Sequence, residues 1–216
     1  YNKKSNLAVH GGSPIYDKEF PPYNTIDIEE INAANKVLNS GILSGFVASP
    51  GSQFFGGDET IKLEETFCNY FGVNFAVSVN SATSGLHAAL IAAGVSSGDE
   101  VIVPPYTMSA SATTITMCGG VPIFVDIEEE FYCLDPNKVQ SAITSKTKAI
   151  MAVNLFGQPA DLFALREIAQ ENRLILIEDN SQAPGAKYHD NYAGTIGDLG
   201  VFSFNRHKAI QCGEGG

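Results

Sequence analysis

A lysine near the end of the chain has the surroundings of a reactive side chain. Lys208 lies in FSFNRHKAIQCGEGG (202–216), after an apolar run and before a group of glycines. The end of a strand holds a side chain rigidly, and glycines let a ligand come close to the backbone. A partly desolvated lysine loses its charge more easily and can form a Schiff base with a carbonyl compound. The alternative is an ordinary solvated surface lysine.

The segment NSATSGLHAAL (80–90) could bind phosphate. A predicted strand ends here, small hydroxylated residues make a turn, and a helix begins. The free amides of the helix N-terminus, together with the hydroxyls of Thr83 and Ser84, form a suitable cradle for an anion. Serine and threonine also cap helices where no ligand binds, so both interpretations stay open.

A pair of carboxylates ends another predicted strand, in LILIEDNSQAPGA (174–186). Strand alternation sends Glu178 and Asp179 to opposite faces, so at most one of them points into a given cleft. A carboxylate at the end of a buried strand requires a cation or several hydrogen-bond donors. A cap for the following turn or a magnesium ligand would also meet this requirement, and the nearby Gln182 does not decide between them.

Together, a phosphate cradle, a carboxylate and a lysine are the groups needed to hold pyridoxal phosphate. The phosphate would bind at the helix N-terminus, and the carboxylate would keep the pyridine nitrogen protonated so that the ring withdraws electrons. The lysine would bind the aldehyde and later move a proton. The three groups in this order therefore predict a pyridoxal phosphate enzyme.

Strands and helices alternate from residue 74 onward, which predicts how these groups are positioned. Several of the strands are continuously apolar, as expected of parallel strands covered by helices on both faces. We expect a three-layer α/β sandwich with a largely parallel, mixed sheet and a site at the carboxyl ends of its strands. The predicted strands are 74–80, 100–104, 121–127, 148–155, 174–179 and 199–204, and the predicted helices are 83–94, 108–118, one beginning near 135–136, and 161–173.

The first 73 residues have a different pattern. Two amphipathic helices, 26–41 and 58–72, flank a glycine-rich loop that is too long to be a simple connector. We expect residues 1–73 to be part of the same domain as residues 74–216, which would bind the cofactor.

Composition excludes several classes of protein. The chain has 216 residues, 44% of them hydrophobic, and a formal net charge of −11, which argues against nucleic acid as a partner. The four cysteines form no CxxC pair and the four histidines show no metal-ligand spacing, so we expect reduced thiols and no metal. No apolar run is long enough to span a membrane and no secretory signal is present in the sequence, so we expect a cytoplasmic protein without membrane contact.

The sequence also resembles a known family along its whole length. It is similar to the fold-type I pyridoxal phosphate aminotransferases of the DegT/DnrJ/StrS group, which act on nucleotide-linked keto-sugars. The stretches that carry this resemblance are HGGSPI (10–15), VLNSGILSG (37–45), GDEVIVPPYT (98–107), PIFVDI (122–127), NLFGQPAD (154–161) and FSFNRHKAIQCGEGG. The resemblance implies an aspartate-aminotransferase-like large domain.

Roles follow from the resemblance where positions match. Lys208 occupies the place of the family's Schiff-base lysine in FSFxxxK, and Asp179 that of the aspartate paired with the pyridinium nitrogen. Gln182 falls near the hydroxyl side of the ring. The groups expected around the phosphate are Thr83, Ser84 and Ser203.

Three features depart from the family pattern. Ala82 stands where many relatives have glycine, and Met108 stands where the family usually places an aromatic ring against the cofactor. A thioether packs on a ring but offers less stacking. The family continues past the position of Gly216 with a further strand and a smaller C-terminal domain, so we expect this chain to be a fragment.

The resemblance implies transfer of an amino group from an amino acid, with glutamate expected, to a nucleotide-linked keto-sugar in a homodimer. A dehydratase of the same family is the closest alternative, because those enzymes carry histidine at the lysine position and His207 is adjacent to Lys208. A non-catalytic regulatory relative is another. A magnesium-dependent phosphate enzyme using Asp179 is disfavoured because no GxxxxGK[ST] loop is present.

Overall fold

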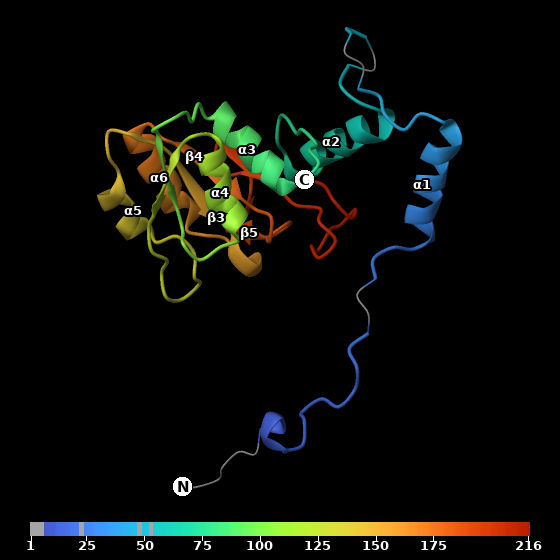
Figure 1. The fold of residues 1–216 in the computed structure, drawn as a ribbon, viewed down its shortest axis with the longest axis horizontal. Coiled ribbons are helices and arrows are strands. Elements are labelled where there is room, and N and C mark those ends of the chain that lie inside the picture. Colours follow the sequence, from blue (N-terminus) through green and yellow to red (C-terminus); the bar gives the residue numbers. More distant parts are fainter. Residues whose placement is uncertain (1–6, 22–23, 47–48, 52–53) are drawn as a thin grey trace. The chain divides into compact units, whose positions relative to one another are not determined.

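A five-stranded parallel sheet in the order β2-β1-β3-β4-β7 forms the centre of the larger unit of the chain (Figure 1). All its neighbouring strands pair in parallel, as the continuously apolar sequences predict. This computed structural model describes residues 7–21, 24–46, 49–51 and 54–216. The strands are β1 (Glu100–Val103), β2 (Val121–Phe124), β3 (Thr147–Val153), β4 (Ile175–Asp179) and β7 (Leu199–Val201).

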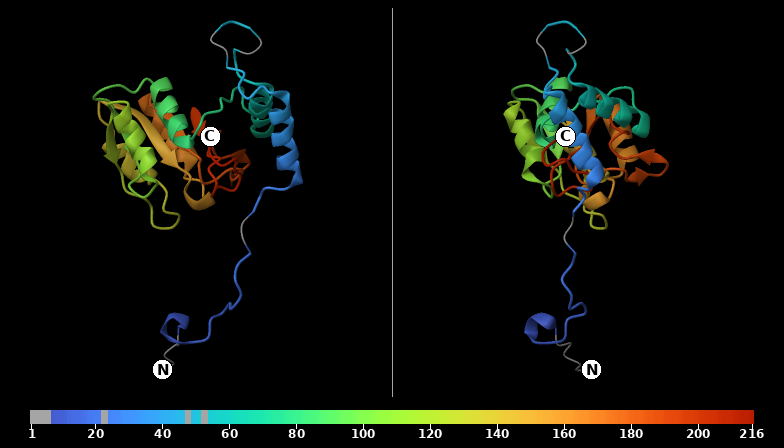
Figure 2. Two further views of the ribbon diagram at one scale, coloured as in Figure 1. Left: turned by 45° about the vertical axis from the view of Figure 1, so that its right-hand side comes forward. Right: turned by 90° about the vertical axis from the view of Figure 1, so that its right-hand side faces the viewer.

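Helices cover both faces of the sheet (Figure 2), which confirms the three-layer α/β prediction. Along β3, Ala149 and Met151 pack with α3 and α4, whereas Ile150 and Ala152 pack with α5 and α6. Successive side chains of a strand point to opposite faces, and both faces here are apolar because both are covered. These helices are α3 (Ala82–Ala92), α4 (Ser109–Met117), α5 (Pro136–Ala142) and α6 (Leu162–Asn172).

One predicted strand is wrong. Residues 74–80 run as irregular chain, and Phe75 and Val77 are largely exposed. A strand needs a neighbour along its length. Within the described residues, backbone pairing of this segment is limited to Val79, which exchanges two hydrogen bonds with Gly216 at 2.9 and 3.0 Å.

Other boundaries differ by a few residues. Strand β2 ends at Phe124 and β7 at Val201, each three residues before the predicted end. The sequence did not predict the short antiparallel pair β5 (Lys187–Tyr188) and β6 (Asn191–Tyr192), because two-residue strands carry no hydrophobic period.

The described chain divides into two units, residues 1–43 and 44–216. The first contains a 3₁₀ turn, Ala8–His10, and α1 (Ile28–Ser40), which begins with a reciprocal cap between Asp27 and Glu30. Helix α2 (Asp58–Phe71) belongs to the second unit. Part of the predicted glycine-rich loop lies outside the described residues, and the assignment of residues 1–73 to one domain with the rest stays a prediction. No helix within the described ranges has the length and apolar character needed to cross a bilayer.

A buried carboxylate fixes the end of β4. Glu178 is fully buried, and its Oε1 accepts the N–H groups of Ile196 at 2.8 Å and Gly197 at 2.6 Å. Its Oε2 accepts the N–H of Gly194 at 2.5 Å and Nδ2–H of Asn154 at 3.1 Å. Four donors compensate the cost of burying the charge. Glu178 thereby ties the loop before β7 to the end of β4.

Replacing Glu178 with glutamine should destabilise the chain by about 2 kcal/mol or more, because an amide donor would then face buried N–H groups that have lost their acceptor. Urea unfolding followed by circular dichroism measures the change. The matched control Glu167→Gln alters an exposed carboxylate on α6 and should stay within about 0.5 kcal/mol of the parent. Equal stability of the two variants would contradict the role given to Glu178.

Candidate functional site

A cavity of about 690 Å³ lies at the carboxyl ends of the strands, where the sequence places the site. Segments far apart in sequence meet there, from the α3 N-terminus to the loop after β7. Lys208 and Asp179, 29 positions apart, both line it. The predicted site residues on its wall are Thr83, Met108, Asp179, Gln182, Ser203 and Lys208, whereas Ser84 is not on the wall.

Asp179 is the last residue of β4 and is 5% exposed. Its Oδ2 accepts the hydroxyl of Ser111 at 2.8 Å, and its Oδ1 accepts the N–H of Ser181 at 3.2 Å. Asp179 lies on the α3–α4 face because Ser111 belongs to α4. Glu178 contacts the loop before β7, so the two carboxylates diverge as strand alternation predicts. Asp179 is thus held rigidly at the cavity wall.

The N-terminus of α3 opens at the cavity. The cap of this helix is Ser81, whose Oγ accepts the N–H of Ser84 at 3.1 Å. The hydroxyl of Ser84 lies 3.1 Å from the same Oγ, and Ser84 is not among the lining residues. Thr83 and Ala82 line the cavity, and Thr83 is exposed. The N-terminus is therefore both capped, by Ser81, and open to an anion.

Lys208 lies in a turn beyond β7, not at the strand end, because β7 stops at Val201. Its N–H donates to the carbonyl of Asn205 at 2.9 Å, and the residue is half-buried. Ser203, between strand and turn, is 6% exposed. The amide nitrogen of Asn205 donates to both oxygens of Glu214 at 3.0 Å, and these contacts brace the turn.

Phe156 is a further cavity residue, which the sequence analysis did not select. It has a left-handed backbone with φ 53°, and its N–H donates to Oε1 of Gln182 at 3.0 Å. Gln182 therefore fixes the turn after β3 that carries this ring. Met108 is 65% exposed at the same cavity. One feature of the sequence could have indicated Phe156. It lies in NLFGQ, a glycine-containing turn that directly follows a strand at the carboxyl edge of the sheet.

Sequence reasoning also missed several polar residues on or next to the cavity. Ser111 is buried behind Asp179, and Asn205 has a buried Oδ1 with no hydrogen-bond partner among the described residues. Serine is a common residue type, and no spacing in the sequence links Ser111 to Asp179, 68 positions away. Asn205 lies three residues before Lys208 in FSFNRHK, which is the sequence signal that could have selected it. Other polar residues of the lining are Ser81, Ser181, His207 and Glu214.

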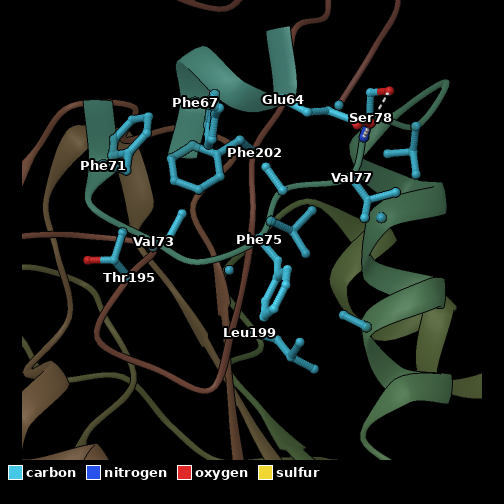
Figure 3. Close-up of a pocket in the computed structure, with 18 of the residues that line it drawn as sticks. Glu64, Phe67, Phe71, Val73, Phe75, Val77, Ser78, Thr195, Leu199 and Phe202 are labelled. Atoms are coloured by element: carbon cyan, nitrogen blue, oxygen red, sulfur yellow. Dashed lines mark hydrogen bonds between the residues drawn. The ribbon is translucent and has the colours of Figure 1, made fainter. Parts of the chain in front are cut away.

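A second cavity, of about 710 Å³, has a mainly apolar lining (Figure 3). It lies between α2, residues 73–79 and β7, and phenylalanine rings such as Phe67 and Phe202 face it. At this cavity, Oε1 of Glu64 accepts hydrogen bonds from the N–H of Ser78 at 2.8 Å and from its hydroxyl at 2.9 Å. The predicted site residues are absent from this lining, so the cavity that contains Asp179 and Lys208 is the candidate site.

Comparison with known proteins finds close similarity to sugar aminotransferases and related enzymes. The chain is 40% identical over 210 residues to an L-glutamine:2-deoxy-scyllo-inosose aminotransferase of Micromonospora echinospora, covering 97% of this chain and 49% of that protein. The crystal structure of a 3-amino-5-hydroxybenzoic acid synthase superposes with a TM-score of 0.84 and 34% identity, over 91% of this chain and 49% of that one.

A third relative is an E. coli GDP-4-keto-6-deoxy-D-mannose-3-dehydratase, solved with bound hydrated PLP. It superposes with a TM-score of 0.79 and 30% identity, covering 89% of this chain and 48% of the other. The chain thus spans about half the length of the relatives it matches. The family model for DegT/DnrJ/EryC1/StrS aminotransferases matches residues 25–216, and with these similarities the chain belongs to that family.

Proposed function

We propose that this chain supplies the pyridoxal phosphate site of an aminotransferase that converts a nucleotide-linked keto-sugar into an amino-sugar. The observation that carries the proposal is the convergence of Asp179, Lys208 and the α3 N-terminus on one cavity. A carboxylate for a ring nitrogen, an amine for an aldehyde and free amides for a phosphate match the three functional ends of that cofactor. Family membership supports the same chemistry.

The residues present fit the cofactor. Thr83, the first amides of α3 and Ser203 would hold the phosphate, while Ser84 would support that turn through Ser81. Met108 would pack against the ring and Gln182 would lie on its hydroxyl side. The buried Oδ1 of Asn205 has no hydrogen-bond partner among the described residues, so this wall offers an unused acceptor to a ligand donor. When bound, the cofactor supplies an electron-withdrawing ring.

Two side chains of this chain would carry the proton chemistry. Asp179 is almost buried and already accepts two hydrogen bonds, so it can hold a proton at the pyridine nitrogen without rearranging. Lys208 would hold the aldehyde end of the cofactor. Once the amine of the amino donor has displaced it there, the freed amine of Lys208 would take up and return a proton at the donor's α-carbon.

The substrates are proposed from the relatives. Glutamate is the donor that we propose, and the inosose aminotransferase, which is named for L-glutamine, makes glutamine the donor to test beside it. The GDP-linked keto-sugar in the name of the dehydratase supports a nucleotide-linked acceptor. We propose a homodimer, which the family resemblance supports, and we place the enzyme in the cytoplasm. No nucleic acid is proposed as a partner because the net charge is −11.

A dehydratase is the second candidate, favoured by the similarity to the E. coli enzyme and by His207, which lines the cavity beside Lys208. Lys208 occupies the lysine position of FSFxxxK, which favours transfer. Product analysis separates the two reactions, because transfer adds nitrogen from the donor to the sugar and dehydration removes water from it. A non-catalytic relative would bind the cofactor and give neither product.

Replacing Lys208 with alanine in the full-length protein should remove the absorbance band that depends on the bond between lysine and cofactor. It should also lower amino transfer by about a thousandfold, because the amine that binds the aldehyde is lost. Absorbance spectra and a coupled assay of keto-acid release measure both effects. The control Lys146→Ala removes an exposed lysine outside the cavity and should change neither. If Lys208→Ala kept this absorbance band, Lys208 would not be the residue that binds the aldehyde.

Replacing Asp179 with asparagine should weaken cofactor binding about tenfold and slow transfer about a hundredfold, because a neutral amide does not favour a protonated ring nitrogen. Fluorescence titration with pyridoxal phosphate and the same coupled assay provide the measurements. Asp190→Asn alters an exposed aspartate beside the β5–β6 turn and serves as the matched control. An Asp179→Asn enzyme with parental affinity and rate would exclude Asp179 as the partner of the ring.

A further inference from the structure

Ser111 is the closest side-chain partner of Asp179 given by the structure, and it comes from a different element. It is the third residue of α4, fully buried, and its Oγ lies 2.8 Å from Oδ2 of Asp179. The two residues are 68 positions apart in sequence. This contact therefore joins α4 to the end of β4 directly behind the cavity wall.

The direction of the hydrogen bonds is fixed by the chemistry of the groups. An ionised carboxylate only accepts, so the single hydroxyl proton of Ser111 is donated to Asp179. Oγ1 of Thr107 lies 3.0 Å from Oγ of Ser111, and because the serine proton is committed, Thr107 must donate here. The result is a relay from Thr107 through Ser111 to Asp179.

The relay differs from ordinary hydroxyl bonding within a helix. Thr114, also fully buried and on the same helix, bonds to the carbonyls of Ala110 and Ser111 at 2.9 and 3.2 Å. Ser111 instead reaches across to another element. A hydrogen bond to a charged acceptor in a buried place is stronger than a neutral one, and chained donors polarise each other.

We propose that Ser111, supported by Thr107, is a positioning residue that fixes the rotamer of Asp179 and stabilises its negative charge. The inference rests on the proposed function, in which Asp179 faces the pyridine nitrogen. A carboxylate stabilised by a donor is a weaker base, so the shared proton stays on the ring nitrogen. Without the donor the proton shifts toward Asp179, and the ring withdraws electrons less strongly.

The test uses the full-length protein loaded with pyridoxal phosphate and carrying Ser111→Ala. The pH midpoint of the bound cofactor's visible absorbance should rise by about half a unit or more, and cofactor affinity should fall about tenfold, because one charge-assisted hydrogen bond is lost. Ser111→Thr keeps the hydroxyl and should restore both values toward those of the parent. The matched control Thr114→Val removes a buried hydroxyl from the same helix and should leave the pH midpoint unchanged.

An unchanged midpoint and affinity in Ser111→Ala, or equal shifts in Ser111→Ala and Thr114→Val, would overturn the inference. If Ser111→Ala does not fold, Thr107→Val tests the relay from its outer end, and it should move the midpoint in the same direction by a smaller amount. No movement in Thr107→Val together with no rescue by Ser111→Thr would overturn it equally. A parent protein that shows no cofactor absorbance would instead refute the proposed function.

Discussion

The carboxyl edge of the sheet depends on how the fold compensates two buried negative charges at the end of one strand. Strand β4 runs through the middle of the apolar core and ends in two adjacent carboxylates, Glu178 and Asp179, both almost inaccessible to solvent. Neither can be left without donors. The alternation of the strand sends them to opposite faces, and each face meets the requirement in its own way.

On one face, backbone N–H groups supply most of the hydrogen-bond donors that the buried carboxylate of Glu178 needs. The loop before β7 turns its N–H groups toward Glu178, and Asn154 adds a side-chain donor. Asn154 also donates to Oδ1 of Asn180 at 2.9 Å and accepts the N–H of Ala160 at 3.0 Å. This closed network makes the carboxyl end of β4 a rigid platform, because a buried polar network with its donors and acceptors satisfied has few alternative arrangements.

On the other face, the donors to Asp179 among the described residues are Ser111 and Ser181, and the carboxylate borders the cavity. The remaining lone pairs can accept from a ligand. The same edge of the sheet brings in the N-terminus of α3 and the turn that carries Lys208. A preorganised anion, a helix N-terminus and an amine are thereby held on separate elements around one space, and little reorganisation is needed when a ligand binds.

The class of fold could be predicted from the sequence, and so could several residues that line the candidate site. Continuous apolar strands alternating with helices predicted a parallel sheet with helices on both faces. Motifs at strand ends, together with the family resemblance, selected six residues that line one cavity. The prediction of a strand at residues 74–80 was wrong, because apolar character does not reveal whether a neighbouring strand is present to pair with. The sequence pattern placed Lys208 at a strand end, whereas a turn holds it. The packing of distant segments placed Phe156 at the cavity and brought Ser111 to Asp179. The sequence could not show the second contact, because residues 68 positions apart carry no periodic signal.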